Sequence, residues 1–298
     1  MAYIGRFAPT PSGPLHMGSL STALLSWLDA RIHSGKWHLR IDDIDTPRIK
    51  PGSTNAILQT LRAHGLDWDG PVQYQSTRLH IYREYLEQLE KRHLTYRCNC
   101  SRKVLKQNGL VYKGTCRNKT SPEIHPPFAI RLKVPEKKIS IADVLQGTQT
   151  VDLAADSGDF IIRRRDGIFA YHFATVLDDF DLGVTNIVRG IDLLPSTFAQ
   201  VLIRDFFSMP AVSYAHVPLW LQSDERKFSK QNSSRAVENH LALQNLRQAA
   251  IRLQLAGEDE TSEIQSIAGM LDLLLARWQQ VSTGHRELPH KVTVDREL

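Results

Sequence analysis

The fold is decided by the stretch Arg6-Phe7-Ala8-Pro9-Thr10-Pro11-Ser12-Gly13-Pro14-Leu15-His16-Met17-Gly18-Ser19. It predicts a strand, a tight turn rich in proline and glycine, and the start of a helix, with His16 and Ser19 facing the turn. The N-terminus of such a helix offers backbone N–H groups and the positive end of its dipole to an anion. The stretch is therefore a candidate phosphate-binding turn. A plain helix cap with a surface histidine is the alternative.

A second polar segment, Lys227-Phe228-Ser229-Lys230-Gln231, lies far along the chain. Its two lysines could neutralise the charge of leaving phosphates on a loop that closes over a nucleotide. His16 could donate hydrogen bonds to phosphate oxygens as charge builds in an in-line displacement. Each segment is common by chance, but the pair predicts a site that grips a nucleoside triphosphate from two sides.

Between these segments the chain alternates between strand and helix patterns. Strands are predicted at 3–8, 37–41 and 184–189, and helices at 20–31, 53–64, 78–92 and 196–207. This order predicts an α/β fold, a Rossmann-like parallel sheet with helices on both faces, whose ligands sit beyond the carboxyl ends of the strands. Residues 160–172 predict a hairpin with a type I′ turn at Asp166-Gly167. The chain after Gln231 predicts helices, and a loosely ordered polar end from Ser282.

A basic block interrupts this alternation. From Lys91 to Lys119 the chain carries nine basic residues and no acidic one. Such a block attracts phosphate backbones, although a solvated loop is an equally ordinary interpretation. We therefore divide the chain into a catalytic domain (1–95 and 184–231), an inserted subdomain (96–183) and a helical C-terminal region (232–298).

All three cysteines, Cys98, Cys100 and Cys116, fall in the basic block. An odd and sparse set argues against a disulfide framework. Zinc in a structural site takes four ligands, so the fourth would be Tyr112, His93, His125 or water, and chemistry alone favours a histidine. Three reduced cysteines without a metal are the alternative. A zinc-bearing subdomain with this charge would face RNA.

Several motifs occur in a fixed order. After the first stretch come Arg40-Ile41-Asp42-Asp43-Ile44-Asp45-Thr46-Pro47-Arg48, Asp166-Gly167 with Tyr171-His172, Ile187-Val188-Arg189-Gly190, and the lysine segment. Over residues 3–232 this resembles the catalytic core of glutamyl-tRNA synthetases, which are class I aminoacyl-tRNA synthetases. The Lys-x-Ser-Lys-Gln-Asn form, the His-x-Gly-Ser form and the short length are most similar to a short branch of that family, the glutamyl-queuosine tRNA(Asp) synthetases.

The resemblance implies roles for individual residues. ATP, accompanied by Mg²⁺, would be bound and activated by His16, Gly18, Ser19, Lys227 and Lys230. Glutamate would be recognised by Arg6, Phe7, Ala8, Pro9, Thr10, Tyr171 and Arg189. Asp42 would hold the α-ammonium, although the family usually has glutamate at this position. One structural Zn²⁺ would be held by Cys98, Cys100, Tyr112 and Cys116.

Length selects the branch, because residues 232–298 are too few for the anticodon-binding region of a full glutamyl-tRNA synthetase. The resemblance then implies transfer of activated glutamate to queuosine in the anticodon loop of tRNA(Asp), which is readable as a single strand. Alternatives are a truncated glutamyl-tRNA synthetase that charges the 3′ end, a non-catalytic zinc-bearing RNA-binding module, and a small-molecule ligase. We expect a cytoplasmic monomer without membrane contact, since no apolar stretch approaches about 18 residues.

Overall fold

The computed structural model describes residues 2–101, 111–119, 124–222, 236–285, 287–289 and 291–294. The chain divides into two compact units. Unit 1 comprises Met1–Tyr74, Val184–Leu193 and Val212–Leu298, and unit 2 comprises Gln75–Gly183 and Leu194–Ala211. The three-part division by function stays a prediction. Among the described residues, no helix is both long and apolar enough to cross a membrane.

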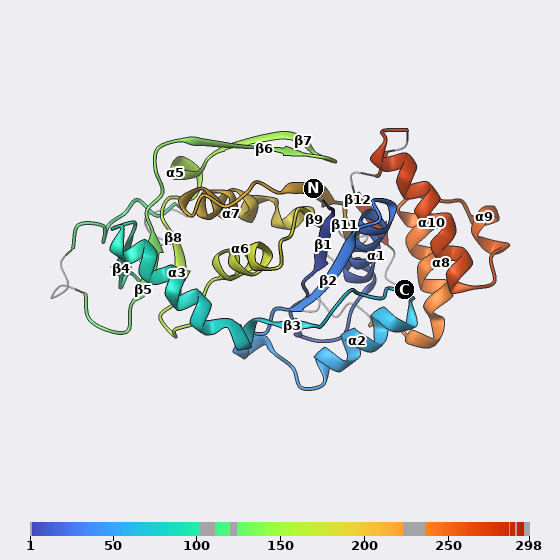
Figure 1. Ribbon diagram of the computed structural model, residues 1–298, viewed down its shortest axis with the longest axis horizontal. Coiled ribbons are helices and arrows are strands. Elements are labelled where there is room, and N and C mark those ends of the chain that lie inside the picture. The colour runs from blue at the N-terminus through green and yellow to red at the C-terminus, as the bar shows by residue number, and fades with distance from the viewer. Residues whose placement is uncertain are drawn as a thin grey trace. The chain divides into compact units, whose positions relative to one another are not determined.

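Unit 1 contains a parallel sheet and a set of helices (Figure 1). Its strands are β1 (Ile4–Phe7), β2 (Lys36–Ile41), β3 (Gln73–Tyr74), β9 (Asn186–Gly190), β10 (Ser213–Val217), β11 (Leu219–Gln222) and β12 (Lys291–Val294). Its helices are α1 (Met17–Ile32), α2 (Ser53–Ala63), α8 (Ala242–Arg252), α9 (Glu258–Ser262) and α10 (Ile267–Ser282). Short 3₁₀ turns are η1 (Thr46–Arg48), η4 (Ile191–Leu193) and η6 (Asn239–Leu241).

The strands of unit 1 run parallel, as the alternation predicted. β2 pairs with β1 and β3, and β10 pairs with β9, all in parallel. β9 lies beside β1, because the Thr185 N–H donates to the Ile4 carbonyl at 2.9 Å and the Ile4 N–H donates to Thr185 Oγ1 at 2.9 Å. The carboxyl ends of strands from distant parts of the sequence therefore meet at one edge of unit 1.

Helix α1 forms the core of unit 1. Leu20, Leu24, Leu25 and Leu28 are fully buried, because α1 packs against the sheet on one side and against α10 on the other. Burial of such a side chain stabilises the fold by about 1.5–3 kcal/mol. Trp278 of α10 donates its indole N–H to Asp29 Oδ1 at 3.0 Å. This packing fixes α1, and so the turn in front of it.

Unit 2 is a mixture of helices and antiparallel strands (Figure 1). Its helices are α3 (Leu79–Lys91), α5 (Leu153–Asp156), α6 (Tyr171–Asp181) and α7 (Leu194–Phe206), with the 3₁₀ turn η2 (Gln75–Arg78) before α3. Its strands are β4 (Thr95–Cys98), β5 (Ala129–Leu132), β6 (Lys138–Asp143), β7 (Gly147–Asp152) and β8 (Phe160–Arg163). β5 pairs antiparallel with β4 and β8, and β6 with β7.

Three sequence predictions need correction. Of the pair Asp166-Gly167 only Gly167 has a positive φ, +88°, so the type I′ turn does not form. After it the chain pairs with β8 only as far as Ala170, whose N–H donates to the Ile162 carbonyl at 2.9 Å, and helix α6 replaces the second strand from Tyr171 onward. The polar C-terminal end is not wholly irregular, because β12 pairs in parallel with β11. In both places tertiary pairing decides over local pattern.

Candidate active site and metal centre

The turn between β1 and α1 ends in a helix cap made by His16. The Ser19 N–H donates to His16 Nδ1 at 3.3 Å, and the His16 N–H donates to Ser19 Oγ at 2.9 Å. This reciprocal pair is a capping box, which satisfies two N–H groups that the first helical turn cannot pair. Because Nδ1 accepts, the proton of a neutral His16 ring lies on Nε2. The predicted placement of His16 and Ser19 at the turn is confirmed.

Gly18 is closely packed at this cap. A Cβ atom at Gly18 would lie 3.3 Å from the His16 ring and 3.3 Å from Trp220 Cβ of β11. On the other side, the Val237 N–H donates to the Leu15 carbonyl at 2.9 Å. Trp220, which precedes the lysine segment 227–231, and Val237, which follows it, therefore both lie against the His16 turn. Lys227 and Lys230 themselves lie outside the described residues, and their roles stay predictions.

Three buried arginines occupy neighbouring strands of unit 1. Arg6 on β1, Arg40 on β2 and Arg189 on β9 have exposures of 3%, 0% and 3%. Arg6 lies opposite His38 in the parallel register, and Arg40, two residues further along β2, is on the same face. Guanidiniums remain charged in proteins and pair bidentately with carboxylates. The region is therefore suited to an anion with more than one carboxylate.

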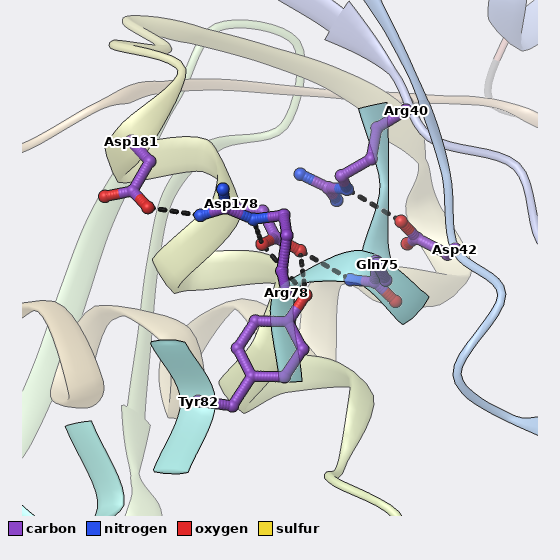
Figure 2. Close-up of polar contacts among 7 residues, drawn as sticks. All are labelled: Arg40, Asp42, Gln75, Arg78, Tyr82, Asp178 and Asp181. Carbon is purple, nitrogen blue, oxygen red and sulfur yellow. Dashed lines mark hydrogen bonds and ion pairs between the residues drawn. The ribbon is translucent and has the colours of Figure 1, made fainter. Parts of the chain in front are cut away.

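Asp42 follows directly after β2 and forms a buried ion pair with Arg40. Arg40 Nε donates to Asp42 Oδ1 at 2.7 Å, and the Asp42 side chain is 4% exposed (Figure 2). The Asp42 N–H donates to the Pro9 carbonyl at 3.0 Å, which joins the end of β2 to the turn after β1. Its contact with an α-ammonium group stays a prediction, and Arg40 is a partner that the sequence did not reveal.

The remaining glutamate-binding candidates are spread over both units. Phe7 is the last residue of β1 and is buried against Trp37, with the ring centroids 6.2 Å apart. Ala8, Pro9 and Thr10 follow in the turn, where the Ser12 N–H donates to the Thr10 carbonyl at 2.8 Å. Tyr171 is the first residue of α6 in unit 2. Its contact with glutamate stays a prediction.

Helix α6 is held by a buried carboxylate in unit 2 (Figure 2). Asp178, with a fully buried side chain, accepts from Arg78 Nε at 2.6 Å, from Gln75 Nε2 at 2.7 Å and from Tyr82 Oη at 2.8 and 2.9 Å. Arg78 also pairs with Asp181. This network joins α6 to η2 and α3, and so fixes the helix that begins with Tyr171.

The three cysteines of unit 2 lie together, as the sequence predicted. Their Sγ atoms are within 4.8 Å of one another, and Cys100 Sγ is 3.4 Å from Cys116 Sγ. Tyr112 Oη lies 3.4 Å from Cys98 Sγ and 3.8 Å from Cys100 Sγ. Within the described part of the chain, this ligand group contains no histidine. Three thiols this close together could hold a metal ion, and Zn²⁺ with Tyr112 as its fourth ligand stays a prediction.

The cysteines of this cluster differ in their thiol pKa. Burial raises the pKa of Cys98, but hydrogen bonds from Tyr112, the Cys100 N–H and Arg131 outweigh it and lower the pKa to about 7. Burial and the Cys116 thiol raise the pKa of Cys100 to about 11. Burial and the neighbouring thiols also raise the pKa of Tyr112. A cation at the cluster would favour the deprotonated forms of all of them.

A second buried carboxylate supports the cysteine cluster. Asp159 accepts from Arg117 Nε at 2.8 Å and from the Val134 N–H at 2.8 Å, and it also accepts from Tyr96 Oη. Arg131 donates to the Asp159 carbonyl at 2.6 Å, and its guanidinium lies 3.7 Å from the centre of the Tyr112 ring. The ligand residues are thereby attached to β5 and β8.

Comparison with known proteins identifies this arrangement. A family described as tRNA synthetases class I (E and Q), catalytic domain, matches residues 4–257. The glutamyl-Q tRNA(Asp) synthetase of Acinetobacter baylyi is 44% identical over 288 residues, covering 96% of this chain and 95% of that protein. The protein of that name from Pseudomonas putida strain W619 is 43% identical and covers 95% of both chains. This chain belongs to the glutamyl-Q tRNA(Asp) synthetase family.

Solved structures of glutamate-tRNA synthetases share this fold. The glutamate-tRNA synthetase of Elizabethkingia anophelis has a TM-score of 0.76 at 25% identity, covering 96% of this chain and 70% of that one. A glutamate tRNA ligase from Elizabethkingia meningosepticum, solved in complex with its amino acid, has a TM-score of 0.75 with the same coverage. The class I synthetase fold predicted from the motif order is therefore confirmed.

Sequence reasoning missed residues of the site that only neighbouring strands bring in. Arg40 was part of a quoted motif but received no role. His216 and Tyr214 of β10 received none either, although their spacing on a strand places both side chains on one face. Arg189 Nε donates to His216 Nε2 at 3.2 Å. Tyr214 and His216 could have been identified only from the pairing of β10 with β9, and a local sequence pattern does not specify which strand pairs with which.

Proposed function

We propose that this chain activates glutamate with ATP to glutamyl-adenylate and then transfers the glutamyl group to queuosine in the anticodon loop of tRNA(Asp). The observation that carries the proposal is the histidine cap of α1 in the same unit as three buried arginines on β1, β2 and β9. A cap with a positive dipole suits a triphosphate. Arg6 and Arg189 suit a dicarboxylic amino acid, while Arg40 pairs with Asp42.

In the first step a carboxylate oxygen of glutamate attacks the α-phosphorus of ATP, and the bond to pyrophosphate breaks. His16 donates through Nε2 to the phosphate oxygens, together with the Gly18 N–H in the first turn of α1, while Ser19 holds the His16 ring through the capping box. Lys227 and Lys230, proposed from the sequence alone, neutralise the leaving pyrophosphate. Mg²⁺ accompanies the ATP.

Glutamate is held by charge. Arg6 and Arg189 pair with its two carboxylates, while Asp42 attracts the ammonium group, with Arg40 fixing the Asp42 carboxylate. Phe7 to Thr10 line the turn. The proposed hydrogen bond from Tyr171, a residue of unit 2, rests on the sequence resemblance alone. In the second step a queuosine hydroxyl oxygen attacks the acyl carbon, the bond to AMP breaks, and an ester forms as the hydroxyl proton is lost.

One Zn²⁺ bound by Cys98, Cys100, Tyr112 and Cys116 would supply a structural cross-link between β4 and residues 112–116. The proposal is tested by zinc retention against a competing chelator. Tyr112→Phe keeps the ring against Arg131 but removes the oxygen ligand, so zinc should be lost at lower chelator concentration. Tyr85→Phe is the matched control, since Tyr85 lies in the same unit but packs edge-on against Phe207. Equal retention in both variants would favour water as the fourth ligand.

The tRNA would approach the basic block of unit 2. Not all of its cations are equally suited to phosphate, because Arg117 is paired with Asp159 and Arg97 lies 4.6 Å over the Phe128 ring. Exposed Lys91, Lys113 and Lys119 are the better candidates. We propose that the enzyme acts as a monomer in the cytoplasm.

The deciding experiment has two stages. ATP–pyrophosphate exchange with glutamate and no tRNA tests activation. Labelled glutamate is then located on tRNA(Asp) after nuclease cleavage, with tRNA(Asp) lacking queuosine as the control. Label in the anticodon-loop fragment supports the proposal. Label on the terminal adenosine would mean a truncated glutamyl-tRNA synthetase, and absence of exchange would leave only RNA binding.

A further inference from the structure

Strand β10 holds the guanidinium of Arg189 from the neighbouring strand. Arg189 and His216 are direct partners in the parallel register of β9 and β10. Arg189 Nε donates to His216 Nε2 at 3.2 Å, and the Arg189 guanidinium carbon lies 5.4 Å from the centre of the Tyr214 ring. The Tyr214 and His216 rings are themselves stacked, 6.0 Å apart with planes 14° from parallel. Two side chains of one strand therefore fix one arginine.

The direction of the hydrogen bond defines the state of His216. A guanidinium has only donors and remains charged, so His216 Nε2 must accept. An imidazolium could not accept, and it would place a second positive charge beside Arg189 at a site where His216 is fully buried. His216 is therefore the neutral ring with its proton on Nδ1.

This contact also decides which edge of Arg189 meets an anion. A carboxylate pairs with two N–H groups of the guanidinium in a fork. Because Nε is engaged by His216, the pairing edge is the one formed by the two Nη atoms. A long arginine side chain loses rotamer freedom when it binds, and a side chain already fixed loses less.

We propose that His216 is a positioning residue for substrate recognition, which holds Arg189 so that its Nη edge receives a carboxylate of glutamate. The inference rests on the proposed function, because it takes Arg189 as a glutamate ligand. Tyr214 supports the same orientation through the face of the guanidinium. His216 itself touches no reacting atom.

The test compares variants that differ in where they carry an acceptor. His216→Gln places an amide oxygen near the Nε2 position, whereas His216→Asn ends at the Nδ1 position and His216→Leu has no acceptor. In ATP–pyrophosphate exchange, His216→Leu and His216→Asn should raise the KM for glutamate about tenfold or more. His216→Gln should keep the KM for glutamate close to the wild-type value. The KM for ATP should remain within about twofold in all three, since the loss concerns uniform binding of the amino acid.

His64 provides a matched control in the same unit. It is also fully buried, and its Nε2 also takes a hydrogen bond, from Asn245 Nδ2 at 3.0 Å. His64→Leu should lower thermal stability in the manner of His216→Leu and leave the KM for glutamate unchanged. Equal KM effects of the two leucine variants would mean that His216 is only structural, and would overturn the inference.

A double-mutant cycle with Arg189→Ala separates the inference from the proposed function. If His216 acts through Arg189, then adding His216→Leu or His216→Asn to Arg189→Ala changes the KM for glutamate by less than about twofold. If the KM effects of the two substitutions multiply instead, His216 does not act through Arg189, and the positioning role is overturned. If Arg189→Ala alone leaves the KM for glutamate unchanged, Arg189 is not a glutamate ligand, and that part of the proposed function fails first.

Discussion

Replacing Asp178 by asparagine should destabilise unit 2 far more than replacing its neighbour Asp181. Both carboxylates pair with Arg78, but the side chain of Asp178 is fully buried and that of Asp181 is 32% exposed. In Asp178→Asn one oxygen becomes an amide NH₂ group. Either orientation of the amide then faces a donor, from Arg78 on one side or Gln75 on the other.

The magnitude follows from burial. Breaking a buried ion pair by changing one partner costs about 3–5 kcal/mol, whereas an exposed pair contributes about 0–1 kcal/mol. We therefore expect Asp178→Asn to lower the free energy of unfolding of unit 2 by about 3 kcal/mol or more. Asp181→Asn should lower it by less than about 1 kcal/mol.

Hydrogen exchange read by mass spectrometry is the assay, because it resolves the two units. Peptides from α6 should exchange on the order of 100-fold faster in Asp178→Asn, and little faster in Asp181→Asn. All five tryptophans lie in segments of unit 1, so tryptophan fluorescence provides an internal control that should barely change. Equal exchange rates of α6 in the two variants would refute the reasoning from burial.

The remaining predictions concern the cysteine cluster and the lysine segment. Burial raises the pKa of Asp159, but its hydrogen bonds and ion pair outweigh this and hold the pKa below its ordinary value. The stabilisation from the Asp159 carboxylate is therefore present above the unfolded-state pKa of about 3.9 and is lost as pH falls through the lower folded-state value. In urea unfolding, the free energy of unfolding of Asp159→Asn should differ most from that of the wild type at neutral pH. A difference that stays constant down to pH 2 would contradict this. Gly158→Ala should weaken zinc retention, because the new Cβ would lie 2.1 Å from the Tyr112 carbonyl and would displace Tyr112. Gly147→Ala is the control: Gly147 has a similar φ with nothing within 4 Å of a new Cβ, so this variant should retain the metal. Lys230→Ala should slow pyrophosphate exchange at least about 100-fold with little change in glutamate binding by calorimetry; normal exchange would remove this lysine from the mechanism.

Local patterns predicted most elements of unit 1 because each is specified by its own residues. The strand before Pro9, the capped helix after His16 and the apolar face of α10 are visible in hydrophobic spacing and cap residues. The same approach missed β4, β5, β6 and β7 of unit 2, although β6 alternates buried and exposed side chains. β8 falls within the predicted hairpin. Each of the missed strands has only four to six residues, too few for an alternating pattern to stand out from the surrounding sequence.

The sequence by itself determined the chemistry available to this protein: a histidine cap before a helix, arginines on predicted strands, and three cysteines with a tyrosine at fixed spacing. Only the tertiary structure decided which of these groups meet. The pairing of Arg189 with His216 depends on the register between β9 and β10, and the burial of Asp178 depends on the packing of α6 against α3. Such contacts join residues far apart in the chain, and a local pattern of side chains fixes the face of an element but not its neighbour.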